Sequence, residues 1–63
     1  MKRRALLRTL TEIAESKNLK LEFVRHGGGH DIYHLGTAVL IIGRHADIPE
    51  HTAKITLKTA RNE

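Results

Sequence analysis

The chain has 63 residues and no cysteine, and 11 Lys and Arg against 7 Asp and Glu give it a formal net charge of +4. A chain this short forms one small domain, over residues 1–63, and the lack of cysteine excludes disulfides and cysteine zinc sites. No apolar run approaches the ~20 residues of a membrane span, and the basic N-terminus does not lead into the apolar core of a signal peptide. We therefore expect a cytoplasmic domain whose basic charge favours an anionic partner.

The first predicted element is an amphipathic helix from about residue 2 to residue 17. Leu6, Leu10 and Ala14 recur at helical spacing, and charged side chains occupy much of the remaining surface. Asn18 is a suitable residue for ending this helix. Several arginines lie near its start, where the helix dipole disfavours cations, and this also points to an anionic partner.

Three short strands are predicted next. Residues 19–23 alternate between apolar and charged side chains, which is the period of a half-buried strand. Residues 31–35 form the second strand, and a tight Gly36-Thr37 connection leads to the third, residues 38–42. Because the third run is apolar throughout, we expect it to be central or covered on both faces.

A second helix is predicted to begin at Pro49, which suits the first turn because its missing N–H needs no partner there. Ala53 and Leu57 recur on one face of this helix, and Lys54 and Lys58 recur on a neighbouring face. Such a basic stripe is usually a solvated helix face, but double-stranded-RNA binders use similar stripes to contact phosphates.

The predicted order is α-β-β-β-α. Since a sheet this small must be covered on one side, we expect an α+β fold with two helices on one face of a three-stranded antiparallel sheet. This is the element order of a double-stranded-RNA-binding-like fold. The pattern leaves open which of Ile32 and Tyr33 faces the core.

The most informative segment runs from Arg25 to Asp31 and places His30 directly after three glycines, between two predicted strands. A glycine turn lets the backbone approach a bulky anion, and histidine suits proton transfer near neutral pH. Together they predict RNA cleavage, with the amides of Gly28 and Gly29 and the side chain of Arg25 or Arg44 stabilising charge on the phosphate. The structural alternative is a hairpin turn followed by an ordinary strand residue.

Five histidines also raise the possibility of a metal site. No histidine pair lies on a predicted helix at the spacing of a zinc motif. Asp31 would point away from His30 in a regular strand, so it is a poor additional ligand. We therefore expect no metal and no cofactor.

Two segments of the chain together resemble the motifs of a known family. They are Phe23-Val24-Arg25-His26-Gly27-Gly28-Gly29-His30-Asp31-Ile32-Tyr33 and Ile41-Ile42-Gly43-Arg44-His45-Ala46-Asp47-Ile48-Pro49, with Thr52 following. Through them the chain resembles the HicA-type toxins of bacterial toxin–antitoxin modules, which are small mRNA interferases. The resemblance covers nearly the whole chain, including its length and element order. The departures are Gly29 in place of the usual serine, Gly43 where proline is common, and Ile55 at a position that is often polar.

The resemblance implies a metal-independent endoribonuclease with His30 as general acid/base, and a cognate HicB-type antitoxin protein as its partner, with neither a membrane nor a small molecule involved. The residues expected to bind RNA are Arg25, Gly28, Gly29, Arg44, His45, Lys54 and Lys58. His45 is the first choice for a second acid–base group, followed by His34 and His26. The alternatives are a non-catalytic RNA-binding module of the same fold, and a protein-interaction domain whose basic face binds an acidic partner.

Overall fold

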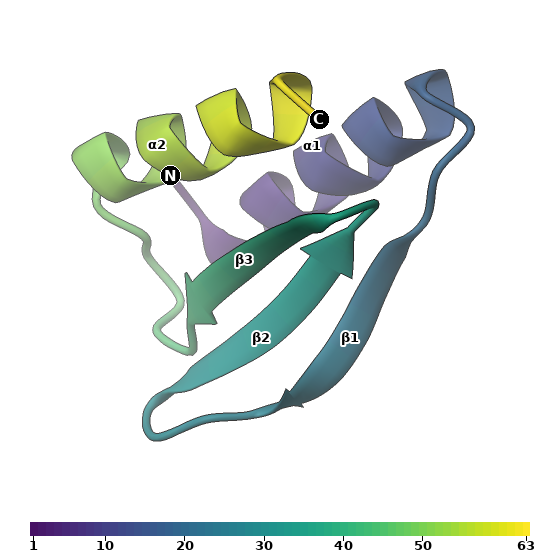
Figure 1. Ribbon diagram of the computed structural model, residues 1–63. Helices are drawn as coiled ribbons and strands as arrows, with labels where there is room; N and C mark the ends of the chain where they lie inside the picture. Colours follow the sequence, from purple (N-terminus) through teal and green to yellow (C-terminus); the bar gives the residue numbers. More distant parts are fainter.

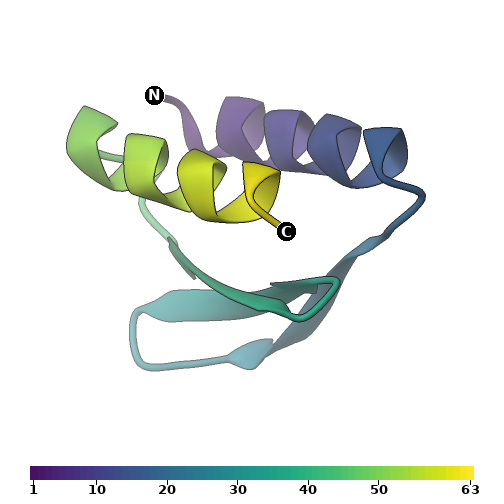
Figure 2. The ribbon, with the colours of Figure 1, turned by 45° about the horizontal axis from the view of Figure 1, so that its top comes forward.

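The computed structural model describes all residues from 1 to 63. Its elements, in chain order, are α1 (Arg3–Ser16), β1 (Leu21–His26), β2 (His30–Leu35), β3 (Ala38–Gly43) and α2 (Glu50–Arg61) (Figure 1). The strands form one antiparallel sheet in the order β1-β2-β3. Both helices lie next to each other on one face of this sheet, so the predicted α+β arrangement is confirmed (Figure 2).

The core lies between the two helices and the sheet. The spacing of four residues puts Leu6, Leu10 and Ala14 on one face of α1, and all three are buried, as predicted. The other buried apolar side chains come from β2, β3, the segment before α2, and α2 itself: Leu35, Leu40, Ile42, Ile48, Ala53 and Ala60. Neither helix combines the length and the apolar character needed to cross a bilayer.

α1 ends in a Schellman motif. Asn18 adopts a positive φ of 57°, which asparagine tolerates better than most residues. The Asn18 N–H donates to the Glu15 carbonyl at 3.1 Å, and the Leu19 N–H donates to the Ala14 carbonyl at 2.8 Å. These bonds satisfy carbonyls at the end of the helix, and they confirm Asn18 as its stop.

The prediction for the third strand is wrong. β3 is an edge strand, and only one of its faces is covered: Leu40 and Ile42 are buried, whereas Val39 and Ile41 are each 56% exposed. The physical reason is that both helices lie on the same face of the sheet, so the apolar side chains on the other face have no layer above them.

β1 also differs from its prediction. It begins at Leu21 rather than residue 19 and continues to His26, and every residue after Leu21 is exposed. Phe23 pairs with Tyr33 across the sheet, yet it is 49% exposed, because β1 is the edge strand on the other side of the sheet and contacts α1 only sparsely. A register shift between Phe23 and Arg25 makes room for one extra residue in β1.

Candidate functional site

The β1–β2 hairpin closes through its three glycines. The Gly27 N–H donates to the His30 carbonyl at 2.6 Å, and Gly29 has a φ of +76°, a conformation that side chains disfavour. The N–H groups of Gly28 and Gly29 donate to no group of the chain. Two adjacent amides at the tip of the hairpin are therefore free to bind an anion, in the manner of a backbone nest.

His30 lies at the start of β2 and faces the side of the sheet without helices. Successive side chains of a strand point to opposite faces of the sheet. Asp31 is buried on the helix side, where it pairs with Ile42, so the side chain of His30 lies on the opposite face. Arg25 pairs with Ile32, two residues from His30, and so shares the open face. A Cβ built on Gly27 would lie 3.0 Å from Nε2 of His30, so the imidazole ring lies against the bare Cα of that glycine.

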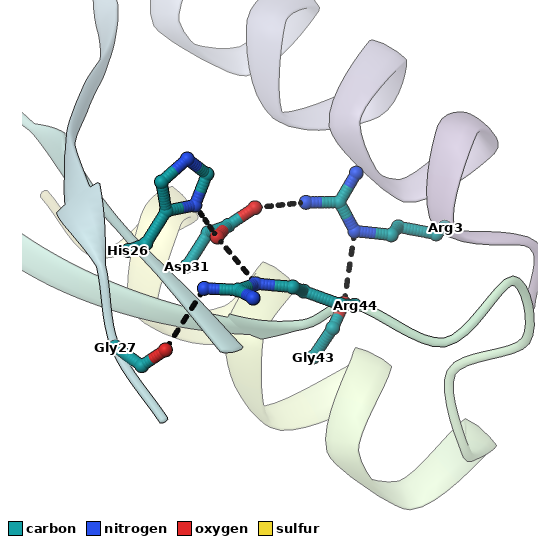
Figure 3. A network of polar contacts seen from close by, with 6 residues as sticks. All are labelled: Arg3, His26, Gly27, Asp31, Gly43 and Arg44. Atoms are coloured by element: carbon teal, nitrogen blue, oxygen red, sulfur yellow. Dashed lines mark hydrogen bonds and ion pairs between the residues drawn. The ribbon is translucent and has the colours of Figure 1, made fainter. Parts of the chain in front are cut away.

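On the helix side, Asp31 is the centre of a network of charged groups (Figure 3). Its Oδ1 accepts a hydrogen bond from Nδ1 of His26 at 2.6 Å and another from Nε of Arg44 at 3.0 Å. Its Oδ2 accepts from Nη2 of Arg3 at 2.7 Å. Asp31 is only 6% exposed, so a nearly inaccessible carboxylate joins side chains from α1, β1 and the segment after β3.

The two arginines also bind backbone carbonyls. Nε of Arg3 donates to the carbonyl of Gly43 at 2.9 Å, and Nη2 of Arg44 donates to the carbonyl of Gly27 at 2.8 Å. The backbone N–H of Arg44 lies 3.4 Å from the Gly29 carbonyl, which it contacts as a long hydrogen bond. Arg44 therefore connects the end of β3 to the glycine hairpin, and two of its side-chain nitrogens are already engaged there.

The pKa of the Asp31 carboxyl is lowered from its ordinary value of 3.8. The hydrogen bond from His26 is the largest cause, and Arg44 adds a second hydrogen bond and a favourable charge, while desolvation acts in the opposite direction. Asp31 is therefore ionised at neutral pH, and it acts there only as an acceptor.

The lowered pKa of Asp31 predicts that the stability of the fold depends on pH in the acidic range. Because the folded-state pKa is below the ordinary one, the ionised carboxylate stabilises the fold above pH 3.8, and this contribution is lost as the pH falls through the folded-state pKa. We expect Asp31→Asn to unfold at a lower temperature than the wild type near neutral pH, with the difference shrinking below pH 3.8. Thermal unfolding followed by circular dichroism across this range measures it. A constant difference at every pH would contradict the assignment.

Sequence reasoning did not find this network. Arg3 near the helix start pointed to an external anion, but its partner Asp31 is 28 residues away in the same chain. Local periodicity carries no information about such a pair. The available signal was the position of Asp31 in β2, where it shares a face with Tyr33 and Leu35, because a carboxylate on the core side of a strand needs cationic partners.

The other predicted binding residues are distributed unevenly. Arg44 lies against the glycine hairpin, and His45 is exposed in the segment between β3 and α2. Lys54 and Lys58 are exposed on α2, in the helical layer, so the sheet separates them from the open face where His30 lies.

Comparison with protein-family models, with curated proteins and with solved structures found no match.

Proposed function

We propose that this protein is a metal-independent endoribonuclease that cleaves mRNA, with His30 as a general acid/base. The observation that carries the proposal is that His30 directly follows two glycines whose amides are unpaired, at the tip of the β1–β2 hairpin, and that its ring lies against Gly27. The amides suit the non-bridging oxygens of a phosphodiester, and the imidazole suits proton transfer near neutral pH. The α-β-β-β-α order and the resemblance of the hairpin motif to HicA-type toxins support the same assignment.

In the proposed reaction the ribose 2′-oxygen attacks the adjacent phosphorus, and the bond from phosphorus to the 5′-oxygen breaks. The 2′-hydroxyl loses a proton and the 5′-oxygen gains one, and His30 carries out one of these two transfers. Such a transfer typically contributes about 10²–10⁴-fold in rate. The free amides of Gly28 and Gly29, with Arg25 on the same face as His30, stabilise the negative charge that develops on the phosphate.

We also propose that a cognate antitoxin protein of the HicB type holds the enzyme inactive in the cytoplasm. An uncovered apolar surface supports a protein partner. Val39 and Ile41 of β3 and Ile55 of α2 are exposed, and they line a shallow groove of about 250 Å³ together with three threonines. Contiguous apolar side chains at the edge of a small sheet are typical of protein-binding surfaces.

Incubating the purified, partner-free protein with a long single-stranded RNA in EDTA tests the proposed activity. Cleavage is the expected result. RNA that is bound but not cut would instead identify a non-catalytic RNA-binding module. Weak RNA retention that disappears at modest salt, with tight binding to an acidic protein, would identify an interaction domain, because affinity for phosphates falls steeply with salt.

Two glycines near His30, Gly27 and Gly43, give a sharp test of how His30 is positioned. Alanine at Gly27 would place a Cβ 3.0 Å from Nε2 and 3.3 Å from the backbone oxygen of His30, so His30 must shift by a few tenths of an ångström. We expect Gly27→Ala to slow RNA cleavage by about 10-fold or more, since misplacing a catalytic group by about 1 Å can slow a reaction by about 10².

Gly43→Ala is the matched control, because a Cβ there meets only Cδ1 of Ile48, at an ordinary contact distance of 3.8 Å, and the residue has no positive φ. We expect this variant to cleave at nearly the wild-type rate. Single-turnover rates of both variants, with the fold checked by circular dichroism, make the comparison. Equal rates for the two would show that the contact between Gly27 and His30 has no catalytic role.

A further inference from the structure

We propose that His26, oriented by Asp31, is the second acid–base group of this hairpin and acts through its Nε2 atom on the phosphodiester that His30 also serves. The inference rests on the proposed ribonuclease activity and adds the missing partner for its second proton transfer. Of the five histidines, only His26 forms a hydrogen bond with a carboxylate.

The carboxylate determines which nitrogen of His26 carries the hydrogen. Both oxygens of Asp31 are occupied, since Oδ1 accepts from His26 and Arg44 and Oδ2 accepts from Arg3. An ionised carboxylate has no hydrogen to donate, so Nδ1 of His26 must be the donor across the 2.6 Å contact. The neutral ring then has its lone pair on Nε2, which is the form that accepts a proton.

The side chains of His26 and Asp31 differ strongly in exposure to solvent. The side chain of Asp31 is 9% exposed, whereas that of His26 is 68% exposed. In Figure 3 the free ring nitrogen of His26 points away from the carboxylate. Only the imidazole is therefore accessible to a substrate. Asp31 is a positioning residue, and its charge stabilises the imidazolium that forms when Nε2 gains a proton.

The placement of the two histidines suits the reaction. His26 pairs with Asp31 and lies on the helix side of the hairpin, and His30 lies on the open side. In-line displacement needs the attacking and leaving oxygens on opposite sides of the phosphorus. Gly27, Gly28 and Gly29, which have no side chains, separate the two histidines along the chain, so the glycine turn carries one histidine on each of its faces.

In the proposed reaction one histidine accepts a proton and the other donates one. Neutral His26 takes the proton of the 2′-hydroxyl at Nε2 as the 2′-oxygen forms its bond to phosphorus. Protonated His30 gives a proton to the 5′-oxygen as the bond from phosphorus to that oxygen breaks. The products are a 2′,3′-cyclic phosphate and a free 5′-hydroxyl, and exchange with water restores the starting protonation of both rings.

The pH dependence of cleavage tests the proposal. A reaction that needs one neutral and one protonated histidine gives a bell-shaped profile of rate against pH. We expect His26→Asn to cut RNA about 10²-fold or more slowly and to lose the acidic limb of the bell. Asparagine keeps a side-chain N–H for Asp31, so the network survives while the proton-transfer group is removed. His26→Ala, which removes that N–H as well, serves as the second variant.

The outcomes separate the two proposals. RNA left intact by the wild type overturns the ribonuclease and this inference with it. A His26→Asn enzyme that keeps the full rate and both limbs of the bell, while His30→Ala is inactive, overturns only the role of His26. Loss of the acidic limb in His26→Asn, with His34→Ala unchanged, supports it.

A second measurement determines the tautomer of the His26 imidazole and does not depend on RNA cleavage. Ring ¹⁵N chemical shifts distinguish the two neutral tautomers of an imidazole. We expect the wild-type spectrum to show His26 with its hydrogen on Nδ1, and Asp31→Asn to shift the ring toward the tautomer with its hydrogen on Nε2. The same tautomer in both proteins would remove the orienting role of Asp31. Backbone amide spectra show whether Asp31→Asn remains folded.

Discussion

Cleavage of single-stranded RNA by the His30→Ala protein is expected to be about 10²–10⁴-fold slower than by the wild type, with RNA binding retained. In the proposed reaction the imidazole is the acid–base group on the open face of the hairpin, and the amides of Gly28 and Gly29, which donate to no group of the chain, would still bind the phosphate in the variant. Single-turnover cleavage rates and a filter-binding or polarisation assay on the same RNA separate the two effects.

His34→Ala is the matched control for this experiment. His34 belongs to the same strand and the same face as His30, and it is exposed, but it lies five residues beyond Gly29, the last residue of the glycine turn. We expect its removal to leave the rate nearly unchanged. If both variants lost the same activity, the loss would reflect the charge of the open face rather than proton transfer at the hairpin.

Leu10→Ala is expected to lower the free energy of unfolding by about 2–5 kcal/mol, the usual result of leaving a cavity at a fully buried leucine. Leu10 is 0% exposed and belongs to the cluster of buried apolar side chains that forms the core. At roughly 0.05–0.15 kcal/mol per residue, a domain this small has only about 3–9 kcal/mol of stability. The variant should therefore lose a large share of the stability of the domain, as urea titration would show.

Ile55→Ala provides the contrast, because Ile55 is 54% exposed in the groove between β3 and α2. Its removal should change the free energy of unfolding by about 0.5 kcal/mol or less. An equal loss from both replacements would mean that Ile55 is covered in solution, contrary to its exposure here.

The helices were predictable because the information that forms them is local. Leucine and alanine at four-residue spacing define the buried face of α1, and Asn18 ends it through its own positive φ. α2 begins at Glu50, directly after Pro49, as the missing N–H of proline favours. Each of these signals lies within one or two turns of the structure that it predicts.

The strands show where local information ends. A continuous apolar run predicted a covered third strand, but β3 lies at the edge with Val39 and Ile41 exposed. An apolar sequence predicts that at least one face of a strand is buried. It does not show whether a second layer of the domain covers the other face. The same limit left Ile32 and Tyr33 undecided until the packing placed Tyr33 against the core.

The candidate site divides in the same way. By itself the sequence determined the two helices, the glycine turn and the place of His30 directly after it, because these depend on neighbouring residues. Only the tertiary structure decided that Asp31 is buried, that Arg3 and Arg44 bind it, and that His26 rather than His45 is held by a carboxylate. The contact of Arg3 with Asp31 joins residues 28 apart. Such contacts depend on how α1 and the end of β3 pack against the hairpin, and no spacing within a single element specifies that packing.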